Sequence, residues 1–276
     1  MQEWHDDEVI GVGSKDVDIR DGDRVLALLT RLRPECVLLL AAYTDVDGCE
    51  DNPSLARAVN CDGAENVARG AQQCGSRLIF ISTDYVFSGT RDGPYEVDDW
   101  PAPLNVYGRT KADAETRLQA LLPDVCIVRT SWLFGVDGKC FPNTILNRVS
   151  AAQEVRVVTD QRGCPTFNRD LAPALVQLAH SDATGIIHIT NSDQCSWYEF
   201  AEYLLEATGA HSSALQPVLT RDFVRSARRP RYSVLSPTSA HGHGIVLQDW
   251  RSATQAYIAE RTGRLSSHAG ALSPRG

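Results

Sequence analysis

RLIFIS at residues 77–82 and CVLLLAA at residues 36–42 are apolar almost without interruption. Strands that helices cover on both faces show such continuous runs, whereas a half-exposed antiparallel strand would alternate. Two further short segments rich in β-branched or aliphatic residues lie at 8–11 and 125–130, and helical stretches separate the four. This alternation predicts βαβ units around a parallel sheet, and therefore an α/β, Rossmann-like doubly wound fold.

The helices predicted around these strands follow from the spacing of their apolar residues. Residues 52–71 form the first and residues 105–122 the second. Beyond Phe134 the regular alternation of predicted strands and helices changes. Helices are expected there at 143–152, 170–179 and 197–208, strands at 155–159 and 185–190, and an irregular, exposed connection at 216–231.

The charge balance of the 276-residue chain excludes several classes of partner. It carries 27 Lys and Arg against 35 Asp and Glu, a formal net charge of −8. Nonspecific binding to nucleic acid or to an anionic membrane needs a basic surface, so we expect neither. No apolar run approaches the roughly 20 residues of a membrane helix, and the first residues are acidic where a signal peptide is basic. These features predict a cytoplasmic protein.

The cysteines and histidines do not predict a metal site. The eight cysteines are spread singly, with no C-x-x-C pair and no zinc-like spacing to histidine, so we interpret them as reduced thiols, most of them in the core. His241-Gly-His243 lacks a further ligand nearby and is interpreted as a surface pair.

The clearest chemical signal is the pattern Tyr107-x-x-x-Lys111 at the start of a predicted helix. Residues four apart on a helix project from one face, so the phenol and the ammonium can meet. A nearby ammonium should pull the pKa of the phenol down from about 10 toward neutrality. Thr83, at the end of a predicted strand, could bind a substrate oxygen beside the phenol, and together the three could protonate a carbonyl as a hydride arrives. By itself the spacing also occurs by chance in long sequences.

Five ordered motifs give that spacing a context. They are FISTDYVFSG (80–89), APLNVYGRTK (102–111), VRTSWLFG (128–135), VVTDQRGCPT (157–166) and RRPRYSVL (228–235). Together they resemble the dTDP-4-dehydrorhamnose reductase family of extended short-chain dehydrogenases/reductases, and the similarity extends from about residue 8 to Trp250. The resemblance implies reduction of the C4 ketone of dTDP-4-dehydro-6-deoxy-L-mannose by NADPH or NADH, giving dTDP-L-rhamnose for cell-surface polysaccharide.

The resemblance also implies roles for individual residues on the substrate side. Tyr107 would donate the proton to the C4 oxygen, while Thr83 and Asp84 would contact the sugar, with Trp132 near it. From its position at the end of a strand, Trp132 could equally be a core aromatic. Arg229 would line the substrate cleft, where arginine suits a diphosphate. A solvated basic loop is the alternative for the arginine-rich segment around it.

On the cofactor side, the resemblance implies that Lys111 holds the nicotinamide ribose and that Asp18 and Ile19 lie near the adenine. Ala41, Ala42 and Tyr43 match the family's cofactor-contacting turn. For the two alanines a place in the core at the end of a strand is an equal alternative. Some relatives use magnesium at a subunit contact, but nothing in this sequence identifies ligands for Mg²⁺, and a homodimer is an open expectation.

The glycine-rich turn of such folds is not found in its usual place. The segment with Gly11 and Gly13 lacks a third glycine and aligns with the family's second strand, so by the resemblance the chain starts about one strand–loop–helix unit late. Either the start lies upstream, which we prefer, or the chain is a short form that binds without reducing. The expected organisation is an incomplete NAD(P)-binding Rossmann region at 1–138, a mainly substrate-binding region at 139–262 with some elements returning to the Rossmann core, and a disordered tail at 263–276.

Two other functions remain open on the sequence. One is a non-catalytic nucleotide-binding subunit, similar to the regulatory beta subunit of methionine adenosyltransferase. The other is a nucleotide-sugar epimerase or dehydratase, which shares the Tyr-x-x-x-Lys pattern and the fold. The substrate-side motifs favour the reductase over both.

Overall fold

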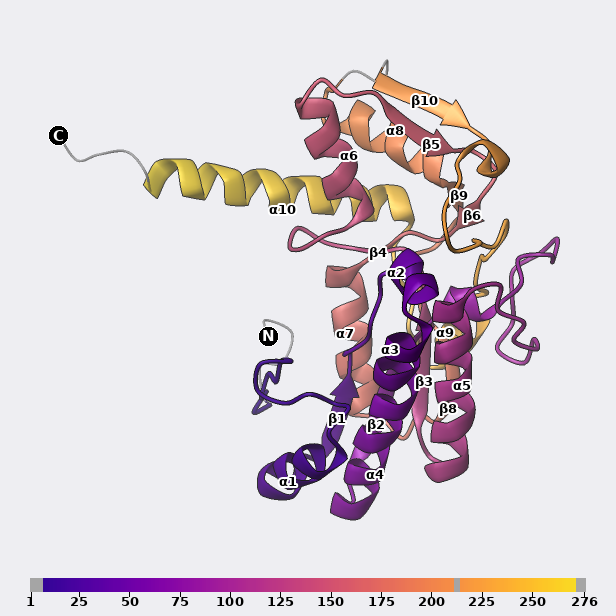
Figure 1. Cartoon of the computed structure of the whole chain (residues 1–276). Coiled ribbons are helices and arrows are strands. Elements are labelled where there is room, and N and C mark those ends of the chain that lie inside the picture. The colour runs from indigo at the N-terminus through magenta and orange to yellow at the C-terminus, as the bar shows by residue number, and fades with distance from the viewer. Residues whose placement is uncertain (1–6, 211–213, 272–276) are drawn as a thin grey trace. The chain divides into compact units, whose positions relative to one another are not determined.

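The computed structural model describes residues 7–210 and 214–271, which divide into two compact units (Figure 1). Unit 1 comprises Met1–Thr130, Ala172–Ile189 and Val224–Val246. Unit 2 comprises Ser131–Leu171, Thr190–Phe223 and Leu247–Gly276. The chain therefore returns to unit 1 twice after leaving it, and each unit is built from segments far apart in the sequence.

Unit 1 is built on a four-stranded parallel sheet. Its strands, in spatial order, are β1 (Cys36–Leu39), β2 (Arg77–Thr83), β3 (Cys126–Thr130) and β8 (Gly185–His188). The predicted α/β fold with a parallel sheet is confirmed. The carboxyl ends of β2 and β3 are aligned, because Thr83 is paired in register with Thr130.

Helices cover this sheet and complete the core of unit 1 (Figure 1). Apolar side chains from α1 (Gly22–Leu32), α4 (Ala64–Cys74) and α5 (Val106–Leu121) pack with buried residues of the first three strands. The other elements of this region are α2 (Val46–Asp51), α3 (Pro53–Arg57), the π-helix η1 (Ala58–Gly63), the 3₁₀ turn η2 (Asp84–Val86), α7 (Asn168–Ala179) and α9 (Thr238–Gly242).

Two sequence expectations for unit 1 need correction. Residues 8–11 form no strand: they have no neighbouring strand to bond with, and Ile10 is exposed. Instead, β1 lies at the edge of the sheet and pairs only with β2 within the described residues. The helix expected over 52–71 is divided into α3, η1 and α4, and the π-helix interrupts it. Asn60, buried within η1, bonds groups outside the helix, and π-helical turns of this kind often occur at functional sites.

Among its described residues, unit 2 has three short strand pairs and three α-helices. The pairs are β5 (Val155–Val158) with β10 (Leu215–Val218), β4 (Leu133–Phe134) with β7 (Thr166–Phe167), and β6 (Arg162–Gly163) with β9 (Cys195–Ser196). The helices are α6 (Phe141–Ser150), α8 (Trp197–Ala207) and α10 (Trp250–Ala271), and a 3₁₀ turn, η4, spans Thr220–Asp222. An aromatic cluster forms the centre of its core and comprises Phe134, Phe167, Phe200, Trp250 and Tyr257.

Two regions of unit 2 are more ordered than the sequence indicates. Residues 215–218, inside the connection expected to be irregular, form β10. The helix α10 continues to Ala271, although a disordered tail was expected from 263; residues 272–276 lie outside the described part. Arg264 supports this extension, because it forms ion pairs with Glu260 one turn earlier and with Asp137. No helix in the described residues is long and apolar enough to cross a membrane.

Candidate functional site

The expected catalytic residues of unit 1 gather where β2 ends and α5 begins. Thr83 is the last residue of β2, and Tyr107 and Lys111 lie on the first turns of α5. Asn105 begins this helix, since its side chain accepts a hydrogen bond from the backbone N–H of Gly108 at 2.8 Å. Thr83 also contacts Tyr107 through a side-chain hydrogen bond. The structure thus brings together the three residues that the sequence places 28 positions apart.

A glycine allows this close approach of α5 to the end of β2. A Cβ atom at Gly108 would overlap the carbonyl oxygen of Tyr85 and lie 2.8 Å from its carbonyl carbon. The neighbouring rings of Tyr85 and Tyr107 meet edge to face, with centroids 6.1 Å apart. Gly108 is therefore required for packing, and only the tertiary contact reveals that requirement.

Lys111 is almost completely buried, with 2% of its surface exposed. Its Nζ donates a hydrogen bond to the carbonyl oxygen of Ile81 at 2.5 Å and lies 3.9 Å from the centroid of the Phe80 ring. Burial lowers the pKa of this amine to about 7, and the negative charge of Glu115 opposes that shift. Near neutral pH the Lys111 amine is therefore divided between its charged and its uncharged form.

The pKa of Tyr107 shifts in the direction opposite to the sequence expectation. Burial raises the pKa of this phenol, and its hydrogen bond with Thr83 compensates only in part. The expected lowering by Lys111 does not contribute, and the Lys111 amine is bonded to the carbonyl oxygen of Ile81 instead. A raised pKa keeps the phenol protonated at neutral pH, which suits a proton donor.

Asp84 follows Thr83 and is buried, with 2% of its surface exposed. Its carboxyl group accepts hydrogen bonds from the hydroxyl of Ser233 at 2.5 Å and from that of Thr83 at 3.1 Å. Burial nevertheless raises the pKa of this carboxyl to about 7. Ser233 belongs to the motif at 228–235, so this bond links that motif to the end of β2.

The expected cofactor turn follows β1 and is held by a residue that the sequence analysis missed. Ala41 is exposed, which excludes the alternative that it belongs to the core. Ala42 and Tyr43 are half-buried. The side chain of Asn60 accepts a bond from the N–H of Tyr43 at 2.7 Å and donates to its carbonyl oxygen at 3.1 Å.

Asn60 also connects this turn to α5. Its amide donates to Thr110 Oγ1 at 3.1 Å, and that hydroxyl in turn donates to the carbonyl oxygen of Tyr107 at 2.9 Å. Asn60 is only 1% exposed. No local signal could have identified it, because Arg57 and Asp62 lie close to it in sequence and polar residues are common in this stretch.

The two residues expected near the adenine lie just before α1. Asp18 forms a two-pronged ion pair with Arg20, which lowers the pKa of its carboxyl to about 2. Ile19 is half-buried and packs against the core of unit 1, next to Gly63. Their adenine role stays a prediction.

Arg229 is only slightly exposed and pairs with α2, so it is not a freely solvated basic residue. Its guanidinium bonds both oxygens of Asp47, at 2.5 and 2.8 Å, and only 10% of the side chain is exposed. Asp47 also accepts a bond from the N–H of Ala227. The pair fixes the arginine-rich segment to α2, and contact between Arg229 and a substrate stays a prediction.

Trp132 belongs to unit 2 and has an unusual backbone conformation. Its φ of 47° lies in the left-handed region, which costs energy for a bulky residue. The indole stacks on Trp197 with centroids 3.5 Å apart, and a Cβ at Gly163 would lie 2.5 Å from the same ring. Trp132 is therefore held firmly within a half-exposed aromatic group.

No metal centre is visible in the described part of the chain. No group of three or more His, Cys, Asp or Glu side chains there could hold an ion. His241 and His243 are exposed.

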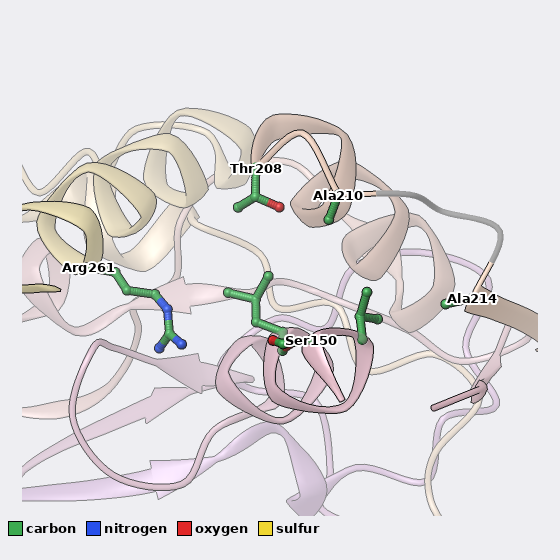
Figure 2. A pocket seen from close by; sticks show the side chains of 7 residues that line it. Ser150, Thr208, Ala210, Ala214 and Arg261 are labelled. Carbon is green, nitrogen blue, oxygen red and sulfur yellow. The ribbon is translucent and has the colours of Figure 1, made fainter. Parts of the chain in front are cut away.

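The hollow shown in Figure 2 lies entirely within unit 2 and has a volume of about 560 Å³. It contains none of the expected catalytic, cofactor or substrate residues, and its lining is mostly apolar around one arginine. The lining residues are Leu146, Val149, Ser150, Thr208, Ala210, Ala214 and Arg261.

Comparison with known proteins agrees with the motifs. The family model described as RmlD substrate binding domain matches residues 2–262. The spore coat polysaccharide biosynthesis protein SpsK of Bacillus subtilis (strain 168) is 38% identical, over 92% of this chain and 89% of that protein. A dTDP-4-dehydrorhamnose reductase of Mycolicibacterium smegmatis is 39% identical, over 92% and 79%.

A solved structure is similar over the same extent. The dTDP-4-dehydrorhamnose reductase of Bacillus anthracis str. Ames in complex with NADP is 33% identical with a TM-score of 0.90, over 94% of each chain. The family resemblance found in the sequence is thus confirmed over nearly all of the chain. Taken with the parallel sheet and the grouped Thr83, Tyr107 and Lys111, these matches show that the chain belongs to the RmlD substrate binding domain family.

Proposed function

We propose that the protein is an NAD(P)H-dependent reductase that converts the C4 ketone of dTDP-4-dehydro-6-deoxy-L-mannose into the alcohol of dTDP-L-rhamnose, for polysaccharide synthesis. The observation that carries this proposal is the contact of Thr83 with Tyr107 at the end of a parallel strand, with Lys111 buried one turn further along α5. Named reductases among the relatives match nearly the whole chain, which disfavours a non-catalytic subunit, an epimerase or a dehydratase.

The described residues fit the nicotinamide half of the cofactor. The exposed small side chain of Ala41 leaves the backbone of the turn accessible. Lys111 would bind ribose hydroxyls from α5, which requires its amine to leave the carbonyl oxygen of Ile81. The reduced nicotinamide supplies a hydride when bound. Within the described residues no glycine-rich turn leads from a strand into a helix, so we assign no residue to the diphosphate.

The chain's own residues supply the proton. The hydroxyls of Thr83 and Tyr107 bind the C4 oxygen, and Tyr107 transfers its proton to that oxygen as C4 is reduced. The raised pKa of Tyr107 keeps the proton on the phenol until negative charge develops on the substrate. The Lys111 ammonium then stabilises the phenolate that is left.

Several further residues are proposed to bind the substrate or the cofactor. Asp84, neutral when its buried carboxyl is protonated, would bind a sugar hydroxyl together with Thr83. Trp132 would pack beside the sugar, and Arg229, while paired with Asp47, would shape the cleft wall.

The eight cysteines are all free thiols, which supports a reducing compartment and therefore the cytoplasm. A homodimer also stays a prediction, and sedimentation of the purified protein tests it.

The decisive experiment is the Tyr107→Phe variant, assayed by oxidation of NADPH, and of NADH, with the keto-sugar. Loss of turnover with unchanged thermal unfolding is expected, because only a hydroxyl is removed. Tyr198→Phe, on α8 of unit 2 and outside the proposed site, is the matched control and should keep most of the activity. Near-normal turnover by Tyr107→Phe would remove this residue as the proton donor.

A further inference from the structure

A buried charged network lies directly behind the catalytic residues of unit 1. Glu115, on α5, is 3% exposed and Arg129, on β3, is 1% exposed. Arg129 donates to both carboxylate oxygens of Glu115, at 3.0 and 2.6 Å, and the hydroxyl of Ser82 donates to one of them. The sequence offers no sign of this network, since its three members come from β2, α5 and β3.

The position of Glu115 relates it to the catalytic helix. Tyr107, Lys111 and Glu115 are spaced four residues apart on α5, so they lie along one face, about one turn from each other. Glu115 acts on Lys111 through its negative charge. Along this face of α5, Lys111 therefore lies between the phenol of Tyr107 and the carboxylate of Glu115.

The strand partners of Glu115 relate it to the other half of the site. Ser82 and Arg129 are register partners on β2 and β3, and each directly precedes the last residue of its strand. Ser82 precedes Thr83, whose hydroxyl contacts Tyr107. One carboxylate therefore bonds the ends of two strands to the helix that carries the proton donor.

We propose that Glu115 is a positioning residue of the reductase, which ties α5 to the ends of β2 and β3 and places a carboxylate one turn behind Lys111. The proposal rests on the proposed function for its catalytic meaning, but the electrostatic effect on Lys111 is a property of the folded chain alone. Glu115 touches no reacting atom and acts through Lys111 and through Thr83.

The other groups that face Lys111 do not replace this charge. On the strand side it meets the Phe80 ring and the carbonyl oxygen of Ile81, which are uncharged. Arg129 is a cation, and its guanidinium is directed to Glu115, to the carbonyl oxygen of Val97 at 3.4 Å and to His188 at 3.4 Å. Burial lowers the pKa of Lys111 to about 7, and Glu115 is the charged group that raises it.

A useful variant removes the charge of Glu115 without unfolding the protein. Glu115→Gln alone leaves Arg129 buried without its counter-ion, and such a variant can fail to fold. The double variant Glu115→Gln/Arg129→Met removes both buried charges together. Asp193→Asn/Arg251→Met is the control, because that ion pair is also formed by a carboxylate and an arginine but is exposed and lies in unit 2.

Direct titration of Lys111 needs no cofactor or substrate. The chain has three lysines, and Lys15 and Lys139 are exposed. Protein labelled with ¹³C at the lysine ε-carbon therefore gives three NMR signals, and Lys111→Met assigns the one of interest. In the double variant the midpoint of Lys111 should move about one pH unit or more to lower pH, while the two exposed lysines and the control variant stay unchanged.

Activity and rescue complete the test. The alkaline fall in kcat should move to lower pH by the same amount, whereas Glu115→Asp, which keeps the charge, should recover most of the wild-type profile. An unchanged Lys111 midpoint in a folded double variant would overturn the proposal. If the wild-type protein has no reductase activity, the proposed function fails while the NMR titration still decides the role of Glu115.

Discussion

Replacing Asp84 by asparagine should change how the stability of the protein depends on pH. Asp84 is buried at the end of β2, and burial raises the pKa of its carboxyl from 3.8 to about 7. Between these two values the folded protein holds a proton that the unfolded chain releases. The wild-type protein should therefore lose stability at this residue as pH rises from about 4 to about 7, and the variant has no carboxyl there to titrate.

The magnitude follows from the size of the shift. A difference of about 3 pKa units corresponds to ~4 kcal/mol in the free energy of unfolding, as an upper value for one group. The asparagine side chain of Asp84→Asn keeps the shape of the aspartate and can still bond Ser233 and Thr83. The free energy of unfolding of the variant, relative to wild type, should thus increase by ~2–4 kcal/mol between pH 4 and pH 8.

Urea unfolding at a series of pH values measures this difference. Lys111 and other groups titrate in both proteins, so subtracting the two curves isolates Asp84. Asp92→Asn is the control, because Asp92 is an exposed carboxyl in a nearby loop. Parallel stability curves for Asp84→Asn and wild type would refute the argument that burial governs this carboxyl.

Three further changes test the arrangement of unit 1. Tyr107→Phe should abolish reductase turnover without lowering the melting temperature, as measured by NADPH oxidation and calorimetry. Gly108→Ala should destabilise the protein by ~1–3 kcal/mol in urea unfolding, because the added Cβ meets the backbone of Tyr85; no loss of stability would contradict the close approach. Asp47→Ala and Arg229→Ala, combined in a double-mutant cycle, should show a coupling of ~1–3 kcal/mol, and strictly additive losses would show that the pair is not coupled.

Much of the catalytic geometry could be predicted from local sequence. Continuous apolar runs predicted β1 and β2, because strands covered on both faces are mostly apolar, and a segment rich in aliphatic residues predicted β3. The spacing of Tyr107 and Lys111 placed them on one face of α5, because residues four apart on a helix project from the same side. The prediction of a strand at 8–11 was wrong. A strand also needs a neighbouring strand to hydrogen-bond with, and the composition of a segment does not reveal whether one is present.

Contacts between residues far apart in the chain could not be predicted from local sequence patterns. Asp84 and Ser233 are 149 residues apart in sequence, and Asp47 and Arg229 are 182 apart. Asn60, the residue that joins the cofactor turn to α5, has no local sequence signal, because other polar residues surround it in the chain. Such pairs depend on which segments the fold brings into contact, and no periodicity encodes that.

The sequence by itself determined the fold class and the family, and it named Thr83, Tyr107 and Lys111 as candidates for proton transfer, because these depend on residue types at short, regular spacings. Only the tertiary structure decided the electrostatics of the site. It reversed the expected shift in the pKa of Tyr107 and joined Glu115 to Arg129 behind Lys111. A pKa depends on how much water a group loses and on which charges share its surroundings, and both are properties of the folded chain.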